Sequence, residues 1–86
     1  MVLPDYTVVD SGRLRKLRRE SGMSRSALAS RAKVGVSTVA RLERGTRPRG
    51  RNYTVARLAN ALGAPFNTLR DPSDPRYVAV KEAAGS

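Results

Sequence analysis

Residues 28–45 decide the fold, and they read Leu-Ala-Ser-Arg-Ala-Lys-Val-Gly-Val-Ser-Thr-Val-Ala-Arg-Leu-Glu-Arg-Gly. Small and apolar side chains recur in the first part of this stretch, and residues 33–35 interrupt them. A second apolar pattern, with Val39 and Leu42 three residues apart, follows and stops at Gly45. Because apolar residues three or four apart share one face of a helix, and glycine is a common helix stop, two short helices are expected. A turn of three to four residues joins them.

Helical patterns also flank this stretch on both sides. Before it, leucines three residues apart mark a helix over residues 13–20, with Ser11 as its expected N-cap, and Ser24 caps the next helix. After it, residues 53–62 carry apolar side chains at i, i+3, i+4 and i+7, and residues 65–69 form one further turn. The sequence therefore predicts an all-α domain of four to five helices.

The length of 86 residues indicates one domain. We expect an N-terminal arm or short strand over residues 1–10, the folded domain over residues 11–69, and a C-terminal loop, strand or tail over residues 70–86. Two segments, residues 6–9 and 77–80, are rich in β-prone tyrosine and valine. Either they pair with each other, or the second pairs with its copy in a dimer, or both are loose ends.

The composition restricts the function more than the fold. Lysine and arginine number 17 against 7 acidic residues, so the net charge is +10 and the isoelectric point is near 11.5. Most of the basic residues lie within residues 13–57, interleaved with the helical pattern, and the acids there are Glu20 and Glu43. A folded block of positive charge indicates a polyanionic partner, either nucleic acid or an anionic membrane. The helices lack the wide Phe- and Leu-rich face of membrane-surface binding.

Several function classes are excluded or disfavoured. The chain has no cysteine and no histidine, which argues against disulfides, thiol chemistry and a zinc site and removes the commonest general base. We therefore expect no enzyme activity, no cofactor, no metal and no small-molecule ligand. The sequence shows no apolar run of about 18 residues and no signal peptide, so a cytoplasmic location without membrane contact is expected.

Two short helices joined by a tight turn, the second followed by a basic loop, form the helix-turn-helix plan. The quoted stretch resembles the lambda-repressor-like domain of Cro, phage repressors and the Xre regulators. Residues 28–29 (Leu-Ala), the inward Val39 and residues 43–45 (Glu-Arg-Gly) fall in register with the pattern of that family. Its first and fourth helices are matched by residues 17–18, 22–24 and 58–63. The resemblance covers residues 12–69.

The sequence departs from the family pattern in the turn, at a helix cap and in the loop. Lys33 stands where the family has a glycine, so either a lysine takes a left-handed conformation or the turn differs. Gly35 replaces the capping Ser or Thr of the recognition helix, which leaves that cap without a side-chain hydrogen bond. Arg25 replaces a glutamine that contacts phosphate and would keep this contact with added charge. The loop after Gly45 is also longer and richer in arginine.

The resemblance and the helix register together indicate a DNA-binding surface. The third helix, over about residues 36–44, is the element that enters the major groove, where Arg41 could bind guanine O6 and N7. Val36 could contact a thymine methyl or simply pack inside, and Ser37 or Thr38 could reach a base edge or a phosphate. The start of the preceding helix would bind phosphate. The expected DNA-binding residues are Ser24, Arg25, Val36, Ser37, Thr38, Arg41, Arg44, Arg47, Arg49 and Arg51.

Two further groups of residues complete the expected site. Residues 48–51 (Pro-Arg-Gly-Arg) resemble the core of an AT-hook, in which an extended Arg-Gly-Arg lies along a narrow A·T minor groove. The loop over residues 47–51 is therefore expected either in the minor groove or, as a solvated basic loop, on phosphates. The family resemblance also implies a structural pair, Arg18 with Glu43, that ties the first helix to the recognition helix.

The expected function is sequence-specific binding of double-stranded DNA by a transcriptional regulator of the Cro or repressor type, of phage or prophage origin. One recognition helix reads one half-site, so a homodimer on a pseudo-palindromic operator is expected. Its dimer surface is either Phe66–Leu69 or residues 77–80. The alternative is a non-specific nucleic-acid-coating or protein-interaction module on the same fold. The few aromatic residues argue against stacking on single strands.

Overall fold

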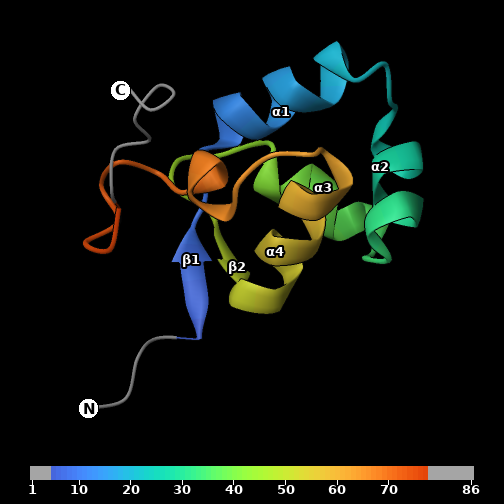
Figure 1. Ribbon diagram of the computed structural model, residues 1–86. Helices are drawn as coiled ribbons and strands as arrows, with labels where there is room; N and C mark the ends of the chain where they lie inside the picture. The colour runs from blue at the N-terminus through green and yellow to red at the C-terminus, as the bar shows by residue number, and fades with distance from the viewer. Residues whose placement is uncertain (1–4, 78–86) are drawn as a thin grey trace.

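The computed structural model describes residues 5–77. The elements in chain order are β1 (Tyr6–Val8), α1 (Ser11–Glu20), α2 (Arg25–Ala32), α3 (Val36–Leu42), β2 (Arg49–Arg51), α4 (Asn52–Ala61) and the 3-10 turn η1 (Phe66–Leu69). In Figure 1, α1 lies across one end of the α3–α4 pair, α2 flanks α3, and the two strands lie on the side opposite α2. The predicted helical architecture is confirmed. Among residues 5–77, no helix combines the length and the apolar character needed to cross a lipid bilayer.

One hydrophobic core joins all four α-helices. Leu14 of α1, Leu28 of α2, Leu42 of α3 and Leu58 of α4 are each at most 1% exposed. Each fully buried leucine contributes about 1.5–3 kcal/mol relative to an exposed one. The complete buried apolar set is Val9, Leu14, Leu28, Ala29, Ala32, Val39, Leu42, Val55, Leu58, Ala59 and Leu69. Packing of one face of α2 and α3 into this core fixes the helix-turn-helix geometry and leaves their other faces to solvent.

The helix starts follow the predicted caps with one correction. Ser24 caps α2, because its Oγ accepts a hydrogen bond from the backbone N–H of Ala27 at 3.0 Å. Gly35 caps α3 with no side-chain hydrogen bond, as expected. The prediction of Ser11 as the cap of α1 is wrong, since Asp10 accepts from the Arg13 N–H at 3.0 Å. A carboxylate satisfies that donor as well as a hydroxyl does and also interacts favourably with the helix dipole.

The turn between α2 and α3 is closed by a left-handed lysine. Lys33 has φ 60° and ψ 47°, the conformation that glycine adopts most easily. The N–H of Val34 donates to the carbonyl of Ala29 at 3.0 Å, which satisfies one of the free carbonyls at the end of α2. The first of the two alternatives for this turn, a lysine in the left-handed conformation, is therefore confirmed.

The strand pairing differs from the prediction. Residues 6–8 pair with Arg49–Arg51 in an antiparallel ribbon, with Thr7 opposite Gly50, and the loop after Gly45 therefore contains a strand. The strand partner of β1 is thus β2, and the three alternatives stated for residues 77–80 fall on a segment of which residues 78–80 lie outside the described part of the chain. The alternation of Arg, Gly and Arg explains the result, because it turns the residue without a side chain toward the core.

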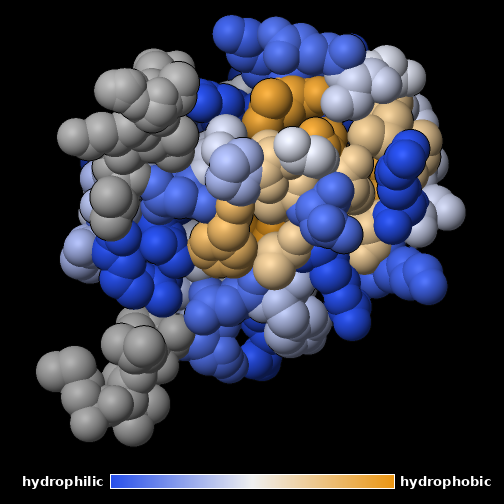
Figure 2. All heavy atoms as spheres, in the orientation of Figure 1, coloured by the Kyte–Doolittle hydropathy of each residue, from blue (hydrophilic) through white to orange (hydrophobic). Residues whose placement is uncertain are grey.

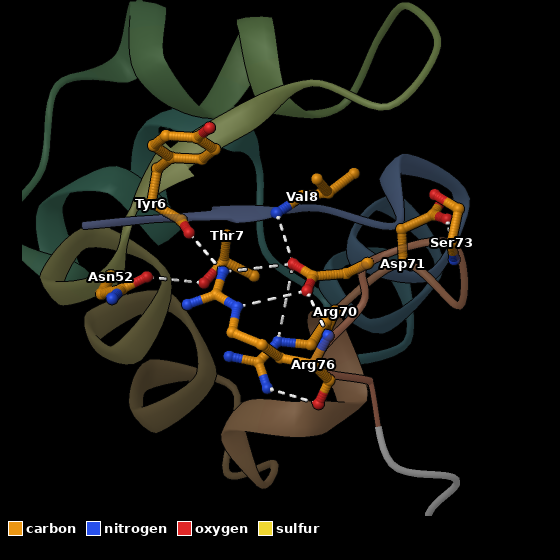
Figure 3. A network of polar contacts seen from close by, with 9 residues as sticks. Tyr6, Thr7, Val8, Asn52, Arg70, Asp71, Ser73 and Arg76 are labelled. Carbon is orange, nitrogen blue, oxygen red and sulfur yellow. Dashed lines mark hydrogen bonds and ion pairs between the residues drawn. The ribbon is translucent and has the colours of Figure 1, made fainter. Parts of the chain in front are cut away.

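The outer edge of β1 is covered by the segment that follows η1 (Figure 3). The Val8 N–H donates to Asp74 Oδ2 at 3.1 Å, and the Val8 carbonyl accepts from the Asp71 N–H at 2.8 Å. The guanidinium of Arg76 donates to the carbonyl of Tyr6 and to the same Asp74 carboxylate. Asp74 is only 3% exposed. The side chains of Asp74 and Arg76 and the main-chain N–H of Asp71 thus occupy hydrogen-bonding positions that a third strand would fill, and the edge of β1 is not free for pairing.

Candidate nucleic-acid interface

The two faces of α3 have opposite character. Val39 and Leu42 are fully buried, whereas Ser37 and Arg41 are exposed and Val36 is 48% exposed. The structure therefore places Val36 on the surface and excludes the alternative in which it packs inside. Thr38, the remaining predicted residue of this helix, is half-buried and is the least available for contact. An exposed valine beside a hydroxyl and a guanidinium is a surface suited to base edges, since thymine presents a methyl group and guanine two acceptors.

Arg41 connects α3 to the strand ribbon. Its Nη1 donates to the main-chain carbonyl of Arg49 in β2 at 2.8 Å, and its side chain stays exposed. This contact could not be predicted from sequence, because it depends on where the loop after Gly45 returns to α3. It fixes the position of a guanidinium that would otherwise sample many rotamers.

The N-terminus of α2 presents free backbone N–H groups and the side chain of Arg25. Ser24 and Arg25 are both exposed there, as predicted for a phosphate contact. Arg25 has a second role that the sequence did not reveal, because its Nε donates to Glu43 Oε1 at 3.1 Å while half of its side chain remains exposed. The helix end and the cation still lie together at the surface, where helix N-termini attract anions.

Behind this surface, Arg18 and Glu43 form the structural pair that the family resemblance implied. Arg18 Nε donates to Glu43 Oε2 at 2.6 Å and Nη2 donates to Oε1 at 3.0 Å. Arg15 Nη1 adds a hydrogen bond to the Glu43 carbonyl at 2.8 Å. Burial raises the pKa of Glu43, but the hydrogen bonds from Arg18 and then Arg25 outweigh it and hold the pKa below its usual value. One carboxylate at the end of α3 thereby binds α1, α2 and α3 together.

The arginines after α3 gather at the surface. Arg44, Arg47, Arg49 and Arg51 are all exposed, and Arg47 adopts a left-handed φ of 54°. Exposed guanidiniums are groups that bind phosphate, and phosphate contact by this loop stays a prediction.

The AT-hook resemblance does not extend to the structure. Gly50 is buried, and a Cβ there would lie 3.1 Å from Val55 Cγ2 and 3.3 Å from Leu42 Cδ1. Its main chain is paired with Thr7, so this Arg-Gly-Arg is not an extended segment free to lie along a minor groove. The side chains of Arg49 and Arg51 are exposed on either side of Gly50.

Strand β1 supplies residues to this surface that sequence reasoning missed. The guanidinium of Arg49 lies over the ring of Tyr6, 5.0 Å from its centroid, and Arg51 Nη1 pairs with Asp5 Oδ2 at 2.7 Å. A shallow pocket of about 370 Å³ is lined by Asp5, Tyr6, Arg41, Arg49, Gly50 and Arg51. Three arginines and one aspartate thus line this pocket. The β-prone character of residues 6–9 was the available signal, but the sequence did not indicate the partner strand.

Comparisons with known proteins agree with this geometry. Residues 11–72 match the family described as the helix-turn-helix domain, and the chain therefore belongs to that family. Among solved structures, it is similar to the restriction-modification controller protein C.AhdI from Aeromonas hydrophila, with 33% sequence identity and a TM-score of 0.62. The similarity covers 67% of this chain and 86% of the controller protein. No curated protein sequence gives a significant match. The predicted family and fold are confirmed.

Proposed function

We propose that this protein is a transcription regulator that binds double-stranded DNA in a sequence-specific manner and acts as a binding protein, not as an enzyme. The observation that carries the proposal is the exposed face of α3, where Val36, Ser37 and Arg41 stand in solvent while the opposite face is locked in the core. Membership of the helix-turn-helix family and similarity to a controller protein support it. The net charge of +10 supports a polyanionic partner.

The base contacts would come from α3 in the major groove. Arg41 would donate two hydrogen bonds to O6 and N7 of a guanine, and Val36 would contact a thymine methyl. Ser37 would reach a base edge or a phosphate, and the half-buried Thr38 would contribute least. Each good bidentate pair discriminates against the wrong base by about 1–3 kcal/mol.

The phosphate contacts would come from both sides of α3. The N-terminus of α2, with Ser24 and Arg25, would hold one phosphate through backbone N–H groups and a cation. The exposed arginines of the following loop would bind neighbouring phosphates: Arg44, Arg47, Arg49 and Arg51. Such contacts set the orientation on the duplex and give sequence-independent, salt-sensitive affinity.

A homodimer on a pseudo-palindromic operator would place two copies of α3 about 10 base pairs apart. Figure 2 shows an apolar area over α4 and the segment after it, framed by hydrophilic side chains. Ala61, Leu62 and Phe66 of these elements are half-buried hydrophobic residues, which supports the Phe66–Leu69 region as the dimer surface. The other candidate, residues 77–80, lies almost wholly outside the described part of the chain. A phage or prophage origin stays a prediction.

Selection of bound duplexes from a random-sequence pool tests this function, at about 150 mM salt and with excess competitor DNA. A regulator of this kind should recover a pseudo-palindrome whose half-sites are about 10 base pairs apart. A non-specific coating protein should instead return no motif and bind every duplex with the same steep salt dependence. The second outcome would contradict sequence-specific regulation without contradicting the fold.

A further inference from the structure

The outer edge of β2, which is the edge not paired with β1, lies beside Arg41 of α3. The Asn52 N–H donates to the carbonyl of Asp5, and the Val9 N–H donates to the carbonyl of Pro48. In an antiparallel strand, successive residues direct their N–H and C=O groups alternately toward and away from the partner strand, and Pro48, Gly50 and Asn52 face β1. The Arg49 carbonyl therefore points to the outer edge of β2, where it accepts the hydrogen bond from Arg41 Nη1 at 2.8 Å.

This contact leaves one edge of the Arg41 guanidinium open. The guanidinium is a rigid planar fork with five N–H donors, and Nη1 lies on the side opposite the edge formed by Nε and Nη2. A carbonyl bound at Nη1 fixes the plane of the fork but does not occupy that edge. Two parallel donors at fixed spacing are what guanine O6 and N7 require.

The carbonyl itself is held rigidly with respect to α3. Gly50, the next residue, packs against Leu42 of α3 and against Val55, and the ribbon partner of Gly50 is the fully buried Thr7. On the other edge of β1, the buried carboxylate of Asp74 accepts from the Val8 N–H. Strand β1, near the N-terminal end of the described chain, thus holds the Arg49 carbonyl in place beside Arg41 of α3.

We propose that the β1–β2 ribbon is a specificity-positioning element for Arg41. The Arg49 carbonyl holds Nη1 and presents the Nε–Nη2 edge to a guanine, so that β1 contributes to base discrimination without contacting a base. A guanidinium oriented before binding loses less side-chain freedom when it meets its base. The inference rests on the proposed function, because it names what positions one of the reading residues.

Three variants distinguish positioning of Arg41 by the ribbon from the general attraction of arginine charges to DNA. Thr7→Pro removes the Thr7 N–H from the pair opposite Gly50 and loosens β2. Arg49→Ala removes a guanidinium but keeps the carbonyl, and is the matched control. Arg41→Ala removes the reading residue. Affinity is measured for the selected duplex and for single-base substitutions of it, with circular dichroism and thermal melting to establish that each variant is folded.

The expected result is a loss of discrimination confined to one base pair. Arg41→Ala should lower the preference there by about 5- to 150-fold, which is the range for one bidentate contact. Thr7→Pro should lose most of that preference while other positions stay discriminated. Arg49→Ala should keep the preference and weaken binding to all duplexes alike. A folded Thr7→Pro variant with unchanged discrimination overturns the positioning role and leaves the proposed function intact.

A second measurement needs no DNA and no variant. In nitrogen-15 NMR spectra of the free protein, the Nη1 protons of Arg41 should show slowed rotation and exchange, unlike those of the exposed Arg19 on α1. A freely rotating Arg41 guanidinium overturns the inference even if Thr7→Pro does not fold. If the wild type shows no base preference at all, the proposed function fails instead, and the two failures are distinguishable.

Discussion

Arg18 of α1 and Glu43, the residue after α3, form a buried bidentate ion pair with atom separations of 2.6 and 3.0 Å. The Glu43 side chain is completely shielded from solvent and that of Arg18 is 10% exposed. Neither residue belongs to the exposed face of α3. Their role is structural, since they hold the end of α3 against α1.

Glu43→Ala is expected to lower the free energy of unfolding by about 3–5 kcal/mol, because it leaves the Arg18 charge buried without its partner. The main effect should be on stability, and DNA affinity should decrease only to the extent that folded protein is lost. Urea denaturation measures the change, and Glu20→Ala, at an exposed position on α1, should stay within about 0.5 kcal/mol of the wild type. An unchanged melting temperature in Glu43→Ala would contradict the structural role of the pair.

Acid should unfold the domain through Glu43 and Asp74. Burial raises the pKa of Asp74, but hydrogen bonds from the Arg76 side chain, the Arg76 N–H and the Val8 N–H outweigh it and keep the pKa below its usual value. The pKa of Glu43 is lowered for the corresponding reason. A carboxyl group whose pKa is lower in the folded state stabilises the fold above its unfolded pKa of about 4. This stabilisation is lost as the pH falls through the lower, folded value.

Asp74→Asn tests this pH dependence. The variant should be less stable than the wild type at pH 7 and should lose less further stability below about pH 4, since one titrating carboxylate is gone. Unfolding free energies between pH 7 and pH 3 measure both effects. Asp5→Asn is the control, because Asp5 forms only an exposed pair with Arg51, and such pairs contribute about 0–1 kcal/mol. Parallel stability curves for the wild type and Asp74→Asn would refute the prediction.

Lys33→Gly should stabilise the protein by up to about 1 kcal/mol. Lys33 has the left-handed φ of 60°, which costs a residue with a side chain about 1–2 kcal/mol, partly offset by the greater chain entropy that glycine loses on folding. Lys33→Ala removes the same charge but keeps the conformational cost, so it separates the two effects. Equal stabilities of the two variants in thermal or urea unfolding would show that the backbone conformation is not the cause.

Arg47→Ala should weaken binding to every duplex by a similar factor. Arg47 is exposed in the loop after α3 and has no place on the reading face, so a phosphate is its expected contact. The slope of log affinity against log salt should become shallower by about 0.9 for one lost phosphate contact. Lys16→Ala, at an exposed position on α1 outside the predicted site, is the control. If Arg47→Ala weakened binding to some DNA sequences much more than to others, Arg47 would contact a base instead of a phosphate.

The helices could be predicted from sequence because their signals are local. The spacing of Val39 and Leu42 and the cap at Ser24 each lie within one or two helical turns. Ser11 was predicted as the cap because serine is a good capping residue, and the cap of α1 is its neighbour Asp10, which belongs to an equally good capping type.

The ribbon could not be predicted because it depends on contacts between distant parts of the chain. Tyr6 pairs with Arg51, which lies 45 positions later in the sequence, and Asp74 lies 66 positions after Val8. Short β-prone segments indicate that a strand exists but do not identify its partner. The exposure of Ser24, Arg25 and Arg41 could therefore be predicted from the helix patterns, and their contact with DNA stays a prediction. The contacts of β1 and the hydrogen bond from Arg41 to Arg49 appear only in the structure.

The most direct test of sequence reading by α3 is the ratio of two dissociation constants at about 150 mM salt. One is measured for the duplex recovered by selection, and the other for a shuffled duplex of the same length and composition. Specific DNA-binding proteins prefer their site by a factor of about 10³ or more, and this protein is predicted to reach that range. Equal affinities for the two duplexes would contradict the proposal and identify a protein that binds DNA by charge alone.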